Sequence, residues 1–270
     1  MNPSQRPSRF GRMLRRWRQA RAASQHELAL ACGVSQRHIS FLETGRSRPS
    51  RGMVLHLGSV LSVPLERQNA MLLAAGFAPV YQRRPLDASE MDPVSRAIDA
   101  LLEGQEPYPA IVVDAAYRIL RANAALGRLL GFLLGFDAVA AAPDAPLNAA
   151  EMVMRPDGLR PVIENWAEVA TWLIRRLRAE AMLEERDGRL GPLLERLLAY
   201  PDVAGFESAG QPEAELPPTL ALRFRKGDSR LALFSVIATV GTPLDVSLQD
   251  VRVELFFPAD EGTRAWFAGA

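Results

Sequence analysis

Residue types that support common enzyme chemistry are scarce in this chain of 270 residues. The single cysteine, Cys32, excludes an internal disulfide framework and a cysteine-based zinc site, and it fits a reduced, cytoplasmic setting. All three histidines lie before residue 57, so residues 79–270 contain neither His nor Cys. This excludes His-based acid–base catalysis, Ser-His triads and His-ligated haem from the second part of the chain. We therefore do not expect an enzyme.

Long apolar runs are also missing. No stretch approaches the roughly 20 uncharged residues that are needed to cross a bilayer. The positive charges near the start are not followed by the apolar segment of a secretory signal. A hydrophobic content of 48% is ample for packed cores, and the length predicts two domains or one large one. We expect a cytoplasmic protein that does not span a membrane.

Lysine is nearly absent, and arginine carries the positive charge. Residues 1–86 hold fourteen Arg against three Glu, which gives a net charge of +11. Residues 87–270 hold eighteen basic against twenty-eight acidic groups, which gives −10. The acidic part is repelled by phosphate, so any binding to nucleic acid must come from the basic part. The split predicts a nucleic-acid-binding segment joined to a part with a different role.

One segment carries the local signals of two helices joined by a sharp turn. Ser24 and Glu27 have the spacing of a capping box, which begins a helix. Gly33 supplies the positive φ of a sharp turn, Ser35 begins a second helix, and Gly45 ends it. The pattern predicts a helix-turn-helix. A helical hairpin that does not bind DNA is the alternative.

The second of these helices is predicted to present polar side chains to solvent. Amide, guanidinium and hydroxyl groups read base edges in the major groove, and an aromatic ring there either touches a thymine methyl or packs inward. We predict base contacts from Gln25, Gln36, Arg37 and Ser40, with Phe41 as a further candidate, and phosphate contacts from Arg46 and Arg48.

The segment resembles the helix-turn-helix of phage-repressor-like (XRE) regulators, in which Q-x-E-L-A, a small residue, G-V-S and I-S-x-L-E-x-G follow one another. The matching residues are Gln25, Glu27, Leu28, Ala29, Gly33, Val34, Ser35, Ile39, Ser40, Leu42, Glu43 and Gly45. The resemblance implies a structural ion pair between Arg18 and Glu43.

Apolar residues at helical spacing predict a five-helix, all-α domain over residues 1–78. Residues 79–93 contain three prolines and mixed charge, and we expect them to be a linker. A helix beginning at Asp92 and Pro93 follows and extends to about Glu103. It is either a dimerisation helix or an ordinary packing helix.

Residues 94–270 are predicted to form an α+β domain. Strands are expected at residues 110–113, 118–122, 219–225, 231–240 and 251–257, with helices over about 162–186 and 190–198 as an insert. Two early strands, an Asp-containing turn and an Asn that opens a helix resemble the start of a PAS domain. We therefore expect a PAS-like five-stranded antiparallel sheet with a helical insert.

The whole arrangement resembles one regulator family, an XRE helix-turn-helix followed by an MmyB-like ligand-binding domain. The resemblance is carried by GVSQRHISFLETGRSRPS, LLAAGFAPVY, EPYPAIVVD, MRPDGLRPVIENW and IATVGTPLDVSLQDVRVELFFPADE. It implies a bacterial transcriptional regulator whose PAS-like domain encloses a small apolar ligand of long-chain fatty-acid type. No other cofactor and no metal are expected.

Aromatic side chains of the second domain are candidates for the wall of a ligand cavity, although each of them also suits a filled core. We predict a lining from Phe132, Phe136, Trp166, Trp172, Phe224 and Phe234, and a carboxylate anchor from Arg160 or Asn165. The leading hypothesis is a homodimeric, ligand-controlled regulator that binds specific DNA sequences. The alternative makes the second domain a ligand-free protein-interaction module with a filled interior.

Overall fold

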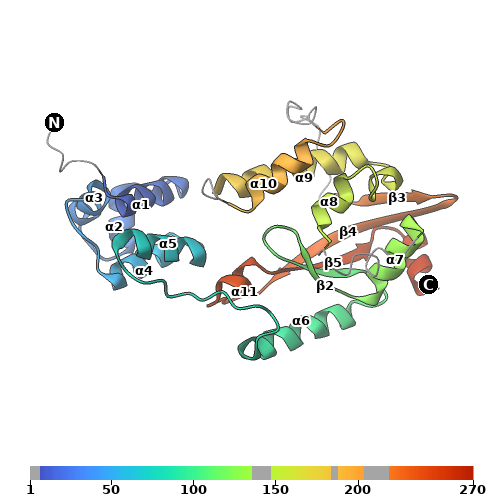
Figure 1. Ribbon diagram of the computed structural model, residues 1–270, viewed down its shortest axis with the longest axis horizontal. Coiled ribbons are helices and arrows are strands. Elements are labelled where there is room, and N and C mark those ends of the chain that lie inside the picture. The colour runs from blue at the N-terminus through green and yellow to red at the C-terminus, as the bar shows by residue number, and fades with distance from the viewer. Residues whose placement is uncertain (1–6, 136–146, 184–187, 204–218, 270) are drawn as a thin grey trace. The chain divides into compact units, whose positions relative to one another are not determined.

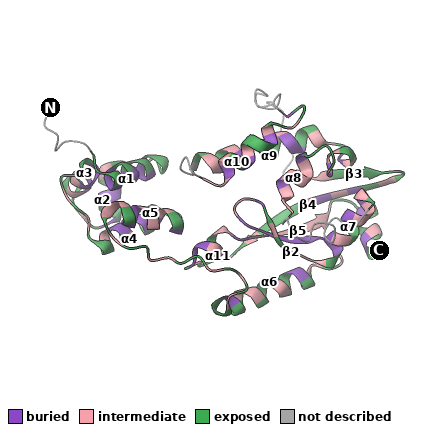
Figure 2. Ribbon diagram, in the orientation of Figure 1, coloured by how far each residue is buried: buried purple, intermediate pink, exposed green. Residues whose placement is uncertain are grey.

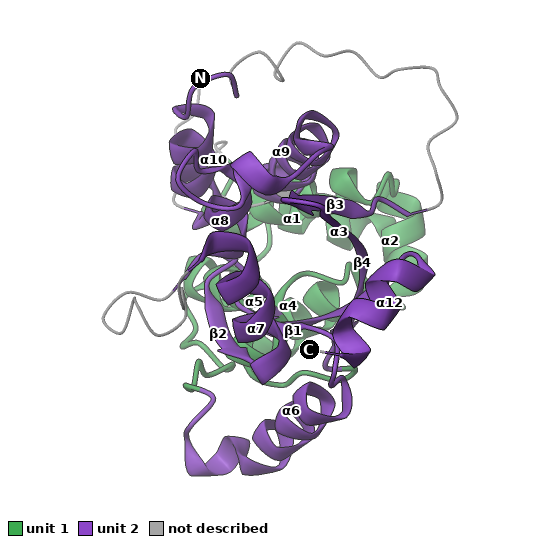
Figure 3. Cartoon of the chain, turned by 90° about the vertical axis from the view of Figure 1, so that its right-hand side faces the viewer, with its two compact units in different colours: residues 1–85, 241–249 green, residues 86–240, 250–270 purple. Residues whose placement is uncertain are grey.

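The computed structural model describes residues 7–135, 147–183, 188–203 and 219–269. The chain divides into two compact units (Figure 3). Unit 1 contains residues 1–85 and 241–249, and unit 2 contains residues 86–240 and 250–270. The predicted linker at residues 79–93 therefore includes the break between the units at residue 85. In the described part of the chain, no helix combines the length and the apolar character that crossing a membrane requires.

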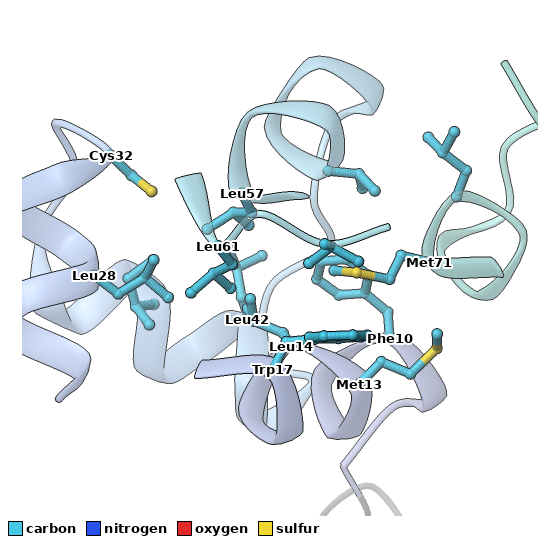
Figure 4. Close-up of a cluster of buried hydrophobic side chains, with 14 of the residues drawn as sticks. Phe10, Met13, Leu14, Trp17, Leu28, Cys32, Leu42, Leu57, Leu61 and Met71 are labelled. Carbon is cyan, nitrogen blue, oxygen red and sulfur yellow. The ribbon is translucent and has the colours of Figure 1, made fainter. Parts of the chain in front are cut away.

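Unit 1 contains the five predicted helices (Figure 1). They are α1 (Arg9–Ala20), α2 (Gln25–Ala31), α3 (Gln36–Thr44), α4 (Arg51–Val60) and α5 (Leu65–Ala75). Their shared core is drawn in Figure 4, where Phe10 and Trp17 of α1 lie with Leu42 of α3, Leu57 of α4 and Met71 of α5. All five helices bury apolar side chains in one cluster, which fixes the orientation of α3 within the unit.

The predicted caps of unit 1 are confirmed. Ser24 and Glu27 form the capping box of α2, with the Glu27 carboxylate accepting from the Ser24 backbone N–H at 2.6 Å. This bond lowers the pKa of Glu27. Gly33 and Gly45 both adopt positive φ, at 64° and 77°. The first lies in the turn before α3 and the second ends α3, so the sequence fixes both ends of this helix.

The start of α5 is capped from far along the chain. Pro64 precedes the helix and offers no side-chain acceptor. The Oε1 atom of Gln249 instead accepts a hydrogen bond from the Leu65 N–H at 2.6 Å. In the same segment the backbone N–H of Val246 donates to the Gln82 carbonyl at 2.8 Å, and Asp245 pairs with Arg84 at 3.0 Å. Residues 241–249 are therefore a structural part of unit 1.

Unit 2 is built on one five-stranded antiparallel sheet of order β2-β1-β5-β4-β3. The strands are β1 (Ala110–Val113), β2 (Ile119–Ala122), β3 (Leu222–Lys226), β4 (Ser229–Thr239) and β5 (Arg252–Pro258). The predicted two early and three late strands are confirmed. The early pair joins the late strands where β1 pairs with β5, with Val112 opposite Val253.

Strand β1, which lies between β2 and β5, is buried on both faces (Figure 2). Ala110 and Val112 point to one face, where α6 (Asp92–Gly104) packs with Ile98 and Leu102. Ile111 and Val113 point to the other face. The sheet thus covers Ile98 and Leu102 of α6, whereas Leu101 on the same helix is 44% exposed, so both the packing and the dimerisation interpretations of this helix stay open.

The second face of the sheet is covered by further helices of unit 2. They are α7 (Ala124–Leu134), α8 (Ala149–Met154), α9 (Trp166–Leu183) and α12 (Glu261–Ala268), and α10 (Leu190–Leu198) packs against α9. The long predicted helix begins four residues later than expected, because Arg160–Val162 form a separate 3-10 turn. The segment of residues 241–249 and α11 (Val246–Asp250) connect β4 to β5.

Candidate nucleic-acid interface and ligand cavity

The outer face of α3 carries the predicted base-reading residues. Ile39 and Leu42 are fully buried, which turns the opposite side of the helix to solvent. Gln36 and Arg37 are exposed and Ser40 is half-buried. Ser35 caps the helix by accepting from the His38 N–H at 3.2 Å. The arrangement matches the recognition helix of a helix-turn-helix, whose first residues contact base edges.

Phe41 lies between two arginines. The guanidinium carbon of Arg37 is 5.0 Å from the centre of the Phe41 ring, and that of Arg46 is 5.8 Å away. Cations at these distances over an aromatic face are attracted by the ring. Phe41 therefore aligns a predicted base-reading residue with a predicted phosphate-binding residue. Arg48, the other predicted phosphate contact, is exposed in the loop after α3.

A buried ion pair holds the C-terminal end of α3 to α1. Nε of Arg18 donates to Oε1 of Glu43 at 2.6 Å and Nη2 donates to Oε2 at 3.1 Å. The two side chains are 11% and 3% exposed. Nη1 of Arg18 also donates to the Ala23 carbonyl at 2.7 Å. The structural pair that the family resemblance implies is present, and it is fully hydrogen-bonded as a buried pair requires.

Gln25 takes part in this network. Its Nε2 donates to Oε2 of Glu43 at 2.8 Å, and the side chain is half-buried. The sequence alone predicts Gln25 as a base contact, whereas the structure gives its amide nitrogen a structural partner. A close approach that the sequence analysis missed lies nearby: a side chain at Gly11 would overlap the backbone carbonyls of Leu42 and Glu43. A glycine inside α1 was the available signal.

Unit 2 encloses a cavity of about 370 Å³ between the sheet and the helices on its second face. This volume is in the range of small-molecule sites. The wall is mostly apolar, with side chains from all five strands of the sheet and from α7, α8 and α9. Representative lining residues are Ile111, Leu126, Leu130, Met152, Val169, Trp172, Leu173, Phe224, Leu233 and Phe256.

The cavity includes only some of the predicted ligand residues. Trp172 and Phe224 line it, whereas the others lie elsewhere. The ring of Phe132 packs on Trp266 at 5.0 Å and the ring of Phe234 stacks on Phe257 at 5.8 Å, so both rings contact aromatic partners outside the cavity lining. Phe136 lies outside the described residues.

The predicted carboxylate anchors are committed to other partners. Arg160 stacks over the Trp166 ring at 3.9 Å and pairs with Asp202 at 2.8 Å, so both Arg160 and Trp166 lie at a separate surface pocket. Asn165 accepts from the Arg223 N–H at 3.0 Å and donates to the Ala221 carbonyl at 2.9 Å. Asn165 thus fastens the start of α9 to β3.

The polar part of the cavity wall was missed by the sequence analysis. It comes from Tyr117, Arg176, Thr219, Ser235 and Glu254. Burial and the neighbouring Glu180 raise the pKa of Tyr117 to about 12, so its hydroxyl stays protonated at neutral pH. Burial also raises the pKa of Glu254. Arg176 lies one helical turn after Trp172, a spacing that places both on one side of α9.

Comparison with known proteins assigns both parts of the chain. Residues 9–71 match a helix-turn-helix domain family, and residues 94–269 match the MmyB-like transcription regulator ligand binding domain. Over 84 residues, 31% of this chain and 58% of the relative, the sequence is 36% identical to the uncharacterized HTH-type transcriptional regulator RghRB of Bacillus subtilis (strain 168). The chain therefore carries a helix-turn-helix domain and belongs to the family defined by the MmyB-like transcription regulator ligand binding domain.

Proposed function

We propose that this regulator binds specific DNA sequences as a homodimer and that a small apolar ligand of fatty-acid type in the unit 2 cavity controls its affinity for DNA. The observation that carries the proposal is the cavity itself, which is mostly apolar and about 370 Å³ in volume. A protein-interaction module with a filled interior would have no need of such a space, because empty apolar volume is destabilising. The cavity therefore favours a ligand over the alternative.

The DNA half of the proposal rests on α3. One recognition helix reads only a few base pairs, and helix-turn-helix proteins gain specificity by placing two such helices one helical turn of DNA apart. A homodimer supplies the second helix. The proposal thus predicts a site with twofold symmetry, and binding to it should be steeply dependent on salt because Arg37, Arg46 and Arg48 are exposed cations in and just after α3.

The connection between β4 and β5 supports control by a ligand. Leu233 and Ser235 of β4 and Glu254 and Phe256 of β5 line the cavity. The segment that joins these two strands, residues 241–249, belongs to unit 1 and caps α5. A ligand that shifts the strands therefore acts on a segment that is built into the DNA-binding unit. The ligand could then favour one arrangement of the DNA-binding unit over another, which is what control of the DNA-binding equilibrium requires.

Arg37→Ala tests the DNA half. Gel-shift titration against a selected operator should show a loss of roughly 1–3 kcal/mol and a relaxed preference at one base position. Arg230→Ala, which removes an exposed arginine from β4 of unit 2, is the matched control and should leave affinity unchanged. Unchanged affinity and preference in Arg37→Ala would remove this residue from base reading.

Ligand control is tested by removing bound lipid under mild conditions and titrating decanoate into the full chain. We expect saturable binding and a change in operator affinity upon saturation. Native mass spectrometry of the protein as purified provides a second reading, since a retained apolar molecule adds a defined mass. A protein that binds the operator normally, but neither retains nor binds any apolar molecule, would contradict the ligand half alone.

A further inference from the structure

The charged side chains of the cavity wall are unusual for an apolar site. Arg176 comes from α9 and Glu254 from β5, and both face a space whose other lining is mostly aliphatic and aromatic, with three hydroxyl groups. A charged or polar group in such surroundings is costly unless it is paired or hydrogen-bonded. The partners of each group therefore indicate what the cavity is built to receive.

Arg176 is held in place by one hydrogen bond and two aromatic rings. Its Nε donates to Oε1 of Glu180 at 3.0 Å, and its guanidinium carbon lies 5.2 Å from the Trp172 ring and 5.8 Å from the Tyr117 ring. Within the described part of the chain, its two terminal nitrogens make no hydrogen bond. Arg176 thus offers the cavity two donor groups in a fixed orientation.

Glu180 is not available to satisfy them. It already accepts from Arg252 through Nη1 at 3.1 and 3.2 Å and through Nη2 at 3.2 Å, in addition to Nε of Arg176. The Tyr117 hydroxyl lies 3.4 Å from one Glu180 oxygen and 3.5 Å from the other. Arg176 and Arg252 together carry one positive charge more than Glu180 balances.

Glu254 is the group that lacks a partner. Among the residues that the structure describes, its carboxyl group makes neither a hydrogen bond nor an ion pair. Burial raises its pKa, Arg176 and Arg252 act in the opposite direction, and Glu180 adds to the rise. Its strand neighbours are Ile111 of β1 and Ile237 of β4, which are both apolar. Glu254 is half-buried and therefore presents accessible acceptor atoms to the cavity, in the same wall as the donor groups of Arg176.

We propose that Arg176 and Glu254 hold the polar head of the ligand between them and select an amphiphile whose head group accepts one hydrogen bond and donates another. A hydroxyl, a primary amide and a protonated carboxyl group all meet this requirement, and an alkyl chain fills the apolar part of the cavity. The inference rests on the proposed function, because it places the ligand in the same cavity. It adds the chemistry by which the head group is recognised.

A fatty acid satisfies this site only with an added proton. A carboxylate accepts from Arg176 but has nothing to donate to an ionised Glu254, and two carboxylates in contact repel each other. One proton must therefore be taken from solvent and shared between the ligand and Glu254. Above the pKa of Glu254 in the free protein, the affinity for a fatty acid should then fall by about tenfold per pH unit, whereas an alcohol should bind independently of pH.

Calorimetric titration of the delipidated full chain with decanoate and with 1-decanol tests this inference. Measurements between pH 6 and pH 8, in buffers of different ionisation enthalpy, give the number of protons taken up. For decanoate we expect close to one proton and the tenfold dependence on pH, and for 1-decanol neither. Glu254→Gln keeps a donor and an acceptor but cannot ionise, so it should bind decanoate without proton uptake. Glu168→Gln, on α9 outside the cavity lining, should behave as the wild type.

The outcomes separate the two proposals. Binding of decanoate without proton uptake by the wild type, or proton uptake that persists in Glu254→Gln, overturns the head-group inference and leaves the ligand function standing. Failure of the wild type to bind either compound overturns the ligand function and, with it, the inference. Operator binding and the thermal transition of unit 2 show whether Glu254→Gln is folded. Arg176→Met should weaken the binding of both decanoate and 1-decanol, and it provides an independent test.

Discussion

The buried ion pair between α1 and α3 allows a quantitative test of what stabilises the position of the recognition helix α3. Glu43→Ala removes three hydrogen bonds to a carboxylate, from Nε and Nη2 of Arg18 and from Nε2 of Gln25. It also leaves the Arg18 guanidinium, which is 11% exposed, without its counter-charge. Breaking a buried pair in this way costs about 3–5 kcal/mol. The melting temperature of a domain of this size falls by roughly 4–8 °C per kcal/mol.

Hydrogen exchange measured by mass spectrometry on the full chain is the suitable assay. Peptides from α1 to α5 should lose about 3–5 kcal/mol of protection in Glu43→Ala. Peptides from the sheet of unit 2 are an internal reference and should not change. Glu66→Ala disrupts the exposed pair with Arg83, in which the side chains are 48% and 42% exposed, and should cost less than about 1 kcal/mol.

Replacing both members of the pair separates charge from packing. Arg18→Met combined with Glu43→Leu removes the uncompensated charge and retains volume, so it should recover most of the stability lost in Glu43→Ala. A loss below about 1 kcal/mol in Glu43→Ala, equal to that of the exposed control, would refute the reasoning. It would mean that the pair contributes no more than a surface contact, despite its burial and its short hydrogen bonds.

Three further variants test other parts of the structure. Gly11→Ala should destabilise unit 1 by about 1–3 kcal/mol in urea denaturation, because the new methyl group overlaps backbone carbonyls of α3. Phe41→Leu should weaken operator binding in gel-shift assays by about 0.5–1 kcal/mol while unit 1 stays folded, since it removes the ring that aligns Arg37 and Arg46. Because burial raises the pKa of Glu254 above 4.5, its contribution to stability is complete below that pH and is lost as pH rises through the folded-state value. The stability of the wild type relative to Glu254→Gln should decline over this interval in urea denaturation of unit 2.

The helix-turn-helix was predictable because its signals are local. Capping residues, a positive-φ glycine and apolar spacing act within one or two turns of helix, and each of them indicates the same structure. The five strands were predictable for the same reason, since alternation and turn residues are short-range features. By contrast, α12 has only Trp266 and Phe267 as apolar contacts in the core. Its position depends on tertiary packing, which the sequence pattern alone does not contain.

The cavity residues were harder to predict because many aromatic residues compete for one core. Phe132 and Phe234 are as apolar as Trp172, and only the tertiary structure shows which ring faces the cavity. A clearer signal was present in β5, where Glu254 stands between the apolar residues Val253 and Leu255 and shares a face with Phe256. A carboxylate at such a position is a candidate for function, since burial without a partner is unfavourable.

The long-range cap on α5 limits how freely the two units can be exchanged between relatives. Gln249 supplies the acceptor that Pro64 lacks, although the two residues are far apart in the sequence. A chimera that joins residues 1–85 to the second domain of another regulator would retain every helix of the DNA-binding unit and still lose this cap. An uncapped helix start costs about 1 kcal/mol. A chimera that keeps the DNA-binding unit intact must therefore also include residues 241–249.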